Sequence, residues 1–339
     1  MKTLCIEIGQ MFTKIAEVHA LPWKCTVTKA QIFVNPVRLV QTDRVPVAET
    51  MCRFLRDSLT NFDSKVKQVC FSAPSPNIYY DKTYNVGRDL EQAAHDAAAQ
   101  LFSVDTKEYK IAWDQPNNQE YLDVLAIPNY IFECYENLAV ALGLELIGLI
   151  DAPFTLSHML NTKGTTNLLI DVNDCVITVT LAQNAQVVAI KRCPSEFAKL
   201  CFDMQKIDAT IDNNTPQDFL YSFGLTNRNA DINNSIDNYI NETLNTIETL
   251  AVELCKEYKT HITNLYVSGL IFNNDNMLQR VHEAFGIPAQ YATQTKTNPD
   301  VKYTCESALP ILNSFWTCIW AHDANTNLWD PSFSQHKQR

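Results

Sequence analysis

The sequence is poor in glycine and has no local excess of positive charge. Only eight of its 339 residues are glycine, about a third of ordinary usage. Nucleotide sites need glycine wherever the backbone approaches phosphate closely, so this scarcity counts against a glycine-lined catalytic site. Lysine and arginine number 27 against 38 aspartates and glutamates, a formal net charge of −11. An acidic chain without a basic run argues against nucleic acid as a partner.

Membrane-spanning segments and patterned cysteines are also missing. No stretch reaches about 18 consecutive apolar residues, and the start of the sequence lacks the pattern of a signal peptide. We therefore expect a cytoplasmic protein without direct membrane insertion. The eleven cysteines show no C-x-x-C motif and no zinc spacing with histidine, which favours reduced, mostly buried thiols. Two of them, Cys5 and Cys175, lie inside apolar runs that resemble strands.

What is present is a folded α/β chain long enough for two domains. Hydrophobic residues make up 46% and charged residues 19%, values typical of folded domains. Apolar runs and extended patterns predict strands within 3–34 and at 67–72, 107–113, 119–127, 167–172, 176–181 and 264–267. Helical spacing predicts helices at 45–61, 88–102, 129–142, 152–160, 240–258, 276–285 and 308–320. The Asn-rich stretch 208–238 is expected to lie at the surface, partly as helix.

One local pattern occurs twice. Near the start, an apolar strand contains Glu7 and is followed by the turn Gly9-Gln10 and a second extended run. Residues 167–174 repeat this pattern, with Asp171 as the acid. Placing residue 7 on residue 171 superposes the two units at an offset of 164 residues, about half the chain. The repeat predicts two similarly built α/β domains.

The order of these elements resembles the actin-like ATPases and, within them, the PilM family of type IV pilus assembly proteins. Ile6-Glu7-Ile8-Gly9 and Lys14 resemble the first phosphate hairpin of that family, and Ile170-Asp171-Val172-Asn173 resembles the second. Val267-Ser268-Gly269, followed by Phe285-Gly286-Ile287-Pro288, resembles its adenosine-side element. The resemblance covers roughly residues 3–321 and depends on the order and spacing of the motifs.

The resemblance implies an α/β, actin-like (ribonuclease H-like) two-lobed fold with an inserted α+β subdomain of the FtsA/PilM type. The implied boundaries are a first lobe at 1–166 with the inserted subdomain at about 67–149, a second lobe at 167–304, a C-terminal helix at 305–323 that returns to the first lobe, and a mobile tail at 324–339.

It also implies the chemistry of the cleft, where two hairpins clasp the phosphates of ATP and each contributes a carboxylate. Glu7 and Asp171 stand where the family has its Mg²⁺-binding acids, and Asp171 is the candidate catalytic residue. The candidate cofactor-binding residues are Glu7, Gly9, Thr13, Lys14, Asn173, Ser268 and Gly269.

Several residues depart from the family pattern. Asn173 stands where glycine is usual, and Ser268 replaces the first residue of a Gly-Gly pair. Bulky Gln10, Met11 and Phe12 occupy positions that usually face phosphate, and together they could fill the cleft. Two alternatives stay open: Glu7 as an acid held by backbone donors at a strand end, and Lys14 as a plain surface lysine. We expect hydrolysis to be weak or absent.

The function implied by the resemblance is a scaffold or adaptor at the inner face of the cytoplasmic membrane, in a type IV pilus-like or type II secretion-like assembly platform. Its implied partner is a PilN-like bitopic membrane protein, whose short cytoplasmic peptide would lie between the first lobe (3–66 and 150–166) and the inserted subdomain. A second copy of the chain, forming a homo-oligomer, is a further expected partner. Residues 327–331 faintly resemble the Asn-Leu-Leu-Pro opening of PilN, so the tail could occupy that groove itself.

Two alternatives belong to other functional classes. An ATP-hydrolysing filament former of the FtsA or plasmid-segregation type would polymerise in a nucleotide-dependent way. A small-molecule kinase of the same superfold would need a glycine-lined phosphate site, which the scarcity of glycine disfavours.

Overall fold

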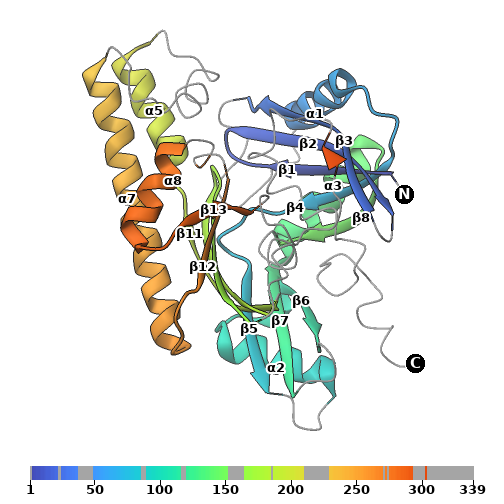
Figure 1. Ribbon diagram of the computed structural model, residues 1–339. Coiled ribbons are helices and arrows are strands. Elements are labelled where there is room, and N and C mark those ends of the chain that lie inside the picture. Colours follow the sequence, from blue (N-terminus) through green and yellow to red (C-terminus); the bar gives the residue numbers. More distant parts are fainter. Residues whose placement is uncertain are drawn as a thin grey trace.

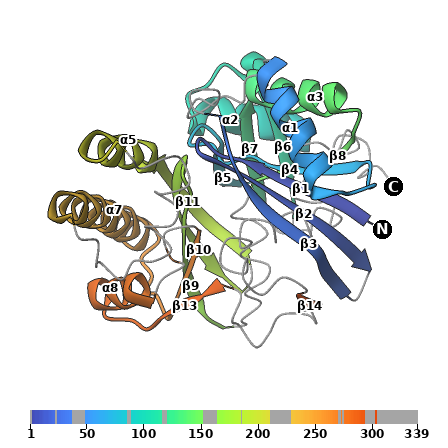
Figure 2. The same cartoon turned by 90° about the horizontal axis from the view of Figure 1, so that it is seen from above.

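The structure is a computed structural model with three β-sheets, arranged as Figures 1 and 2 show. It describes residues 2–21, 24–36, 49–84, 89–115, 120–151, 164–184, 186–209, 229–269, 272, 275–292 and 302–303. Among the helices of these residues, none combines the length and the apolar character needed to cross a membrane.

The first large sheet contains the N-terminal strands and has the order β14-β3-β2-β1-β4-β8. Its strands are β1 (Lys2–Ile8), β2 (Phe12–Leu21), β3 (Lys24–Val34), β4 (Gln68–Ser72), β8 (Glu145–Ile150) and β14 (Lys302–Tyr303). β1 pairs antiparallel with β2 and parallel with β4. Helices α1 (Glu49–Phe62) and α3 (Asn129–Leu142) contact each other and share a buried apolar cluster with β1 and β4.

The second large sheet has the order β11-β10-β9-β12-β13. Its strands are β9 (Thr166–Val172), β10 (Val176–Gln183), β11 (Gln186–Pro194), β12 (Asn264–Gly269) and β13 (Ala289–Tyr291). Helices α5 (Phe197–Ile207), α7 (Ala230–Glu257) and α8 (Asp275–Phe285) lie together on one side of this sheet (Figure 2). The buried residues of α7 recur every three or four positions along its 28 residues, which gives the helix one continuous apolar face.

The third sheet is small and has the order β5-β7-β6. It consists of β5 (Tyr79–Tyr84), β6 (Tyr109–Asp114) and β7 (Tyr121–Pro128), and a short 3₁₀ helix (Thr106–Glu108) leads into β6. Helix α2 (Leu90–Leu101) packs its alanines against Trp113, Leu122 and Val124 of this sheet. Alanine is the smallest residue that favours a helix, so α2 can approach the sheet closely.

The internal repeat expected from the sequence is confirmed by the strand order. In each large sheet a three-stranded antiparallel unit is followed by two parallel strands, as β3-β2-β1-β4-β8 and as β11-β10-β9-β12-β13. β9 begins and ends 164 residues after β1, at Thr166–Val172 against Lys2–Ile8. The turns also match: the Gly9 N–H donates to Phe12 O at 2.8 Å, and the Asn173 N–H donates to Val176 O at 2.9 Å.

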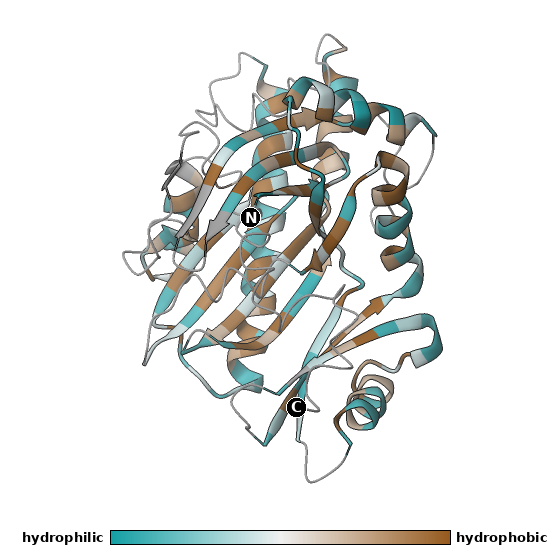
Figure 3. Cartoon of the chain, turned by 90° about the vertical axis from the view of Figure 1, so that its right-hand side faces the viewer, coloured by the Kyte–Doolittle hydropathy of each residue, from teal (hydrophilic) through white to brown (hydrophobic). Residues whose placement is uncertain are grey.

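Figure 3 shows that apolar residues run along the strands of the large sheets, whereas the helices are striped with apolar and polar residues. Two buried clusters result, one around each large sheet. Phe12 of β2 belongs to the cluster of the second sheet, whereas Val187 of β11 belongs to the other cluster, which also includes Tyr80 and Leu125 of the third sheet. Phe12 therefore joins the β1–β2 hairpin to the apolar packing of the second sheet, and Val187 joins β11 to the third sheet.

Some elements differ from the sequence expectations. The patterns do not predict β5, β8, β11 or α5, and α7 extends over 28 residues where a helix of 240–258 is expected. β5 has the sequence Tyr-Tyr-Asp-Lys-Thr-Tyr, which lacks apolar alternation, and its strand form comes from pairing with β7. The helices expected at 152–160 and 308–320, most of 208–228 and the tail lie outside the described residues.

The eight cysteines whose side chains the structure describes are all free thiols. This agrees with the expectation from their scattered spacing. Cys5 lies in β1 as expected, but Cys175 lies in the turn between β9 and β10 and not within a strand. Burial raises the pKa of the Cys175 thiol well above its ordinary value, so the thiol stays protonated at neutral pH.

Candidate functional site

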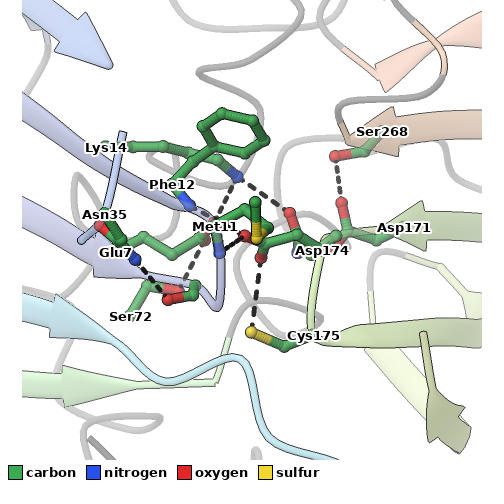
Figure 4. A network of polar contacts seen from close by, with 12 residues as sticks. Glu7, Met11, Phe12, Lys14, Asn35, Ser72, Asp171, Asp174, Cys175 and Ser268 are labelled. Carbon is green, nitrogen blue, oxygen red and sulfur yellow. Dashed lines mark hydrogen bonds and ion pairs between the residues drawn. The ribbon is translucent and has the colours of Figure 1, made fainter. Parts of the chain in front are cut away.

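The candidate site lies where the β1–β2 hairpin of the first lobe meets the β9–β10 hairpin of the second (Figure 4). Glu7 is in β1, Lys14 lies directly opposite it in β2, and Asp171 is near the end of β9. β12 runs parallel to β9 and places Ser268 beside Asp171. The structure thus brings the predicted acids, the lysine and the β12 serine to one place between the lobes.

Glu7 and Lys14 form a buried ion pair. The Lys14 Nζ donates to Glu7 Oε1, and both side chains are only 2% exposed. Ser72 Oγ donates to the other carboxylate oxygen of Glu7 at 3.2 Å. Lys14 is therefore not the surface lysine considered above, and Glu7 is held by side chains instead of backbone donors. The Lys14 Nζ also donates to Asn173 Oδ1 at 2.9 Å, which joins the two hairpins.

The ionisation of this pair is set by burial and by its acidic surroundings. Burial raises the pKa of Glu7 above its ordinary value, although the Lys14 ammonium opposes the shift. Burial alone would lower the pKa of Lys14, but the Glu7 carboxylate together with Asp174 and Asp171 outweighs burial, and the pKa of Lys14 is raised. Asp171 and Asp174 raise the pKa of both groups, because negative charges nearby favour bound protons. The Lys14 ammonium is thus bound by Glu7 and Asn173 inside the protein.

Asp171 is likewise satisfied by neighbouring groups. Ser268 Oγ donates to Asp171 Oδ1 at 2.5 Å, and Asn173 Nδ2 donates to Asp171 Oδ2 at 2.6 Å. Burial raises the pKa of Asp171, and the hydrogen bond from Ser268 and the charge of Lys14 oppose this shift. The amide of Asn173 therefore links Asp171 to Lys14, a connection that a glycine at this position could not make.

The remaining predicted residues shape the turns. Thr13 Oγ1 donates to Asn35 Oδ1 at 2.5 Å, and Asn35 Nδ2 donates to Gly9 O at 2.7 Å, so Asn35 braces the first hairpin. Gly269 has φ of +103°, and a Cβ there would meet the carbonyl oxygen of Val172 at 2.2 Å. Glycine is therefore required at the end of β12. Asn35 has no recognisable signal in the sequence.

Asp174 is the main residue that the sequence motifs do not assign to the site. One of its carboxylate oxygens, Oδ2, accepts hydrogen bonds from the N–H groups of Met11 at 2.7 Å and Phe12 at 3.0 Å. The thiol of Cys175 donates to the other oxygen at 3.4 Å. Asp174 is 3% exposed, so its carboxylate is enclosed between the hairpins. Asn-Asp is an ordinary turn sequence, which explains why the residue attracts no notice.

Phe12, whose N–H group binds Asp174, packs its side chain into the apolar cluster of the second sheet. Its side chain is 1% exposed, and its ring lies 6.0 Å from the ring of Phe197 in α5, centroid to centroid. Met11 is partly buried against the same cluster. Both residues thus pack against the apolar cluster of the second sheet, and the expectation that they fill the cleft stays a prediction.

The carboxylate oxygens that the resemblance assigns to Mg²⁺ are occupied by protein hydrogen-bond donors in this structure. Carboxylate oxygens are suitable ligands for Mg²⁺, but all four oxygens of Glu7 and Asp171 already accept hydrogen bonds from protein groups. Within the described residues, no three His, Cys, Asp or Glu side chains are grouped so that they could hold a metal ion. The roles assigned above to Glu7, Lys14 and Asp171 in binding and catalysis remain predictions.

A cavity of about 210 Å³ lies elsewhere, between the small third sheet and the second lobe. It is lined by Tyr79 and Asp81 of β5, Lys191 of β11 and Tyr258 after α7, among others. Tyr79 stacks on Phe102 with ring centroids 5.5 Å apart. This cavity is not in the groove between the first lobe and the inserted subdomain where the resemblance places a partner peptide.

The two sheets with matching strand order, joined at facing hairpins that carry acids, define the class of protein. The chain has the actin-like fold, with α/β lobes and an additional small sheet.

Several solved structures are similar to this chain over most of its length. A chain of a PilM–PilN type IV pilus biogenesis complex superposes with a TM-score of 0.76 and 13% identity, covering 95% of this chain and 98% of that chain. The ethanolamine utilization protein EutJ from Carboxydothermus hydrogenoformans gives 0.56 and 12% identity, with coverages of 94% and 89%. MreB 5 of Spiroplasma citri bound to AMPPNP gives 0.51 and 11% identity, with coverages of 95% and 96%. No protein-family model and no curated protein matches the sequence.

Proposed function

We propose that this protein is a PilM-like scaffold at the inner face of the cytoplasmic membrane, in a type IV pilus-like or type II secretion-like assembly platform. It would bind a short cytoplasmic peptide of a PilN-like bitopic membrane protein. The proposal is supported by the likeness to a chain of the PilM–PilN complex over 95% of this chain. At 13% identity that likeness carries the fold, and the function is inferred from it.

The observation that favours a scaffold over an ATPase is the internal pairing of Glu7, Lys14 and Asp171. A phosphoryl-transfer site directs its lysine and its metal-binding carboxylates at the phosphates of the substrate. Here the single buried lysine of the site neutralises Glu7 and binds Asn173 instead. In this proposal ATP with Mg²⁺ would bind only to an opened form, as a clamp that sets the angle between the lobes, with weak or no hydrolysis.

The domain boundaries given by the resemblance remain part of the proposal: a first lobe at 1–166 with an insertion at about 67–149, a second lobe at 167–304, a C-terminal helix at 305–323 and a tail at 324–339. The partner peptide would lie in the groove between the first lobe and the insertion. Extended peptides are commonly bound in this way, through a few apolar anchors.

Peptide binding tests the proposal directly. A fluorescent peptide that opens with Asn-Leu-Leu-Pro should bind the purified protein, whereas a scrambled peptide of the same composition should not. Tyr79→Ala alters the cavity between the third sheet and the second lobe, so it should leave peptide binding unchanged. Equal affinity for both peptides would overturn the proposed recognition, and loss of binding in Tyr79→Ala would place the peptide in that cavity.

The role of nucleotide is tested by calorimetry with ATP, with and without Mg²⁺, beside a steady-state hydrolysis assay. We expect no hydrolysis above the level of an Asp171→Ala control. Mg²⁺-dependent ATP binding and turnover that are lost in Asp171→Ala would instead identify an active ATPase. Nucleotide-dependent sedimentation of the protein as polymers would favour the filament-forming alternative.

A further inference from the structure

The turn of the β1–β2 hairpin presents two neighbouring N–H groups to a single negative charge. The N–H groups of Met11 and Phe12 both donate to Asp174 Oδ2, at 2.7 and 3.0 Å. Successive backbone N–H groups that converge on one point form a concave site for anions. The distance from Met11 is typical of a charge-assisted hydrogen bond, in which the acceptor carries a full negative charge.

The carboxylate comes from the other lobe and is held closely. Asp174 lies in the β9–β10 turn, 163 positions from Met11 along the chain, and it is 3% exposed. A Cβ added to Gly9 would meet Asp174 Oδ1 at 2.0 Å, so the glycine at residue 9 makes room for this carboxylate. The contact therefore depends on the absence of a side chain at Gly9 in the first hairpin and on the negative charge of Asp174 in the second.

Lys14 adds positive charge to the same place. The Asp174 carboxylate contributes to the raised pKa of Lys14, which places the two charges within electrostatic reach of each other. Asn173, the neighbour of Asp174, accepts a hydrogen bond from Lys14 Nζ at 2.9 Å. The first hairpin thus supplies two amides that bind the Asp174 carboxylate of the second hairpin, and a cation that binds the neighbouring Asn173.

We propose that the turn at residues 9–12 is an anion-binding site whose occupant is the chain's own Asp174 carboxylate. The carboxylate takes the place that an oxyanion such as a phosphate group would occupy, and by doing so it fastens the two lobes to each other. An external phosphate compound can reach the Met11 and Phe12 amides only when Asp174 leaves them. The inference goes beyond the proposed scaffold function and does not depend on the identity of any partner.

Hydrogen exchange measured by NMR on the full chain tests the contact itself. In Asp174→Ala the amides of Met11 and Phe12 should exchange about tenfold faster or more, because each loses its charged acceptor. The matched control is Asp57→Ala on the exposed side of α1, which removes the same charge far from the hairpins. Unchanged protection of both amides in Asp174→Ala would overturn the proposal.

Inorganic pyrophosphate, titrated by calorimetry, tests whether the site accepts an external anion. Asp174→Ala should bind pyrophosphate about tenfold or more tightly than the wild type and Asp57→Ala. If Asp174→Ala does not fold, Asp174→Asn keeps the shape without the charge and should show the same two changes to a smaller extent. Freed amides without any gain in pyrophosphate binding would show that the turn does not take an external anion, which would also overturn the proposal.

Discussion

Arg192 in β11 and Asp151 at the end of β8 form a buried ion pair that joins the two large sheets. Their side chains are only 5% and 4% exposed. Arg192 Nη1 also donates to the carbonyl oxygen of Ile78 at 2.9 Å, just before β5 of the third sheet. One guanidinium thus connects all three sheets, and burial raises the pKa of Asp151 although Arg192 opposes the shift.

Loss of Arg192 should destabilise the protein strongly. Arg192→Met leaves Asp151 buried without its partner, which typically costs roughly 3–5 kcal/mol. Urea unfolding measures the effect, and the double variant with Asp151→Asn should lose less than the sum of the two single variants. Lys206→Met, which breaks the exposed pair with Asp203 at 3.0 Å, serves as the control and should cost less than about 1 kcal/mol. Equal losses for Arg192→Met and Lys206→Met would contradict this view of the lobe interface.

Truncating Phe12 should weaken the second lobe although the residue belongs to the first hairpin. Its ring is buried in the cluster around the second sheet, so Phe12→Ala should cost about 3–5 kcal/mol in unfolding free energy. Phe202→Ala in α5 is the matched control, because Phe202 is 53% exposed and exposed substitutions usually stay within about 0.5 kcal/mol. Denaturant titrations followed by circular dichroism compare the two. A small loss for Phe12→Ala would mean that the lobes do not share this packing in solution.

Three glycines should respond differently to alanine. Gly9→Ala brings a Cβ to 2.0 Å from the Asp174 carboxylate, and the added Asp174→Ala change should restore part of the lost stability. Gly269→Ala places a Cβ 2.2 Å from the Val172 carbonyl oxygen, so Asp174→Ala should not rescue it.

Gly143, which ends α3, is the control, because it also has positive φ but no atom within 4 Å of its Cβ position. Gly143→Ala should lower the free energy of unfolding by only about 1–2 kcal/mol, the cost of a left-handed backbone conformation for alanine. Thermal unfolding curves of the variants measure these differences. Rescue of Gly269→Ala to the same degree as Gly9→Ala would refute the assigned contacts.

Replacing Asp171 should change how stability depends on pH. Burial raises the pKa of Asp171 above its ordinary value of 3.8, so the folded protein binds this proton more tightly than the unfolded chain does. The Asp171 contribution to stability is therefore greatest below that value and falls as pH rises through the folded pKa.

Asp171→Asn removes this contribution, although it also loses hydrogen bonds at every pH. Relative to the wild type, the variant should therefore gain stability as the pH increases from about 4 towards neutral. Urea unfolding of both proteins across this range measures the difference. A difference that stays constant with pH would mean that Asp171 is not titrating differently in the folded state.

The sequence was enough to single out the two hairpins that meet between the lobes. Glu7, Gly9, Lys14, Asp171 and Asn173 belong to two local units that share one order of strand, acid and turn, and these units lie together in the structure. The surface interpretation of Lys14 was wrong, because its burial depends on Asn173 and Glu7 closing around it. The elements that the patterns missed, such as β5 and β11, are sheet edges whose strand form depends on their neighbours.

The sequence by itself determined the α/β class, the repeat at 164 residues and the position of the two acid-bearing turns, because strand alternation and turn residues act over a few neighbouring positions. The tertiary structure alone decided that Asp174 caps the opposite hairpin and that Phe12 packs in the other lobe. Those contacts join residues more than 160 positions apart, and nothing in either local pattern specifies the distance between two lobes. Only the packing of the two sheets brings a turn carboxylate within reach of the amides that it binds.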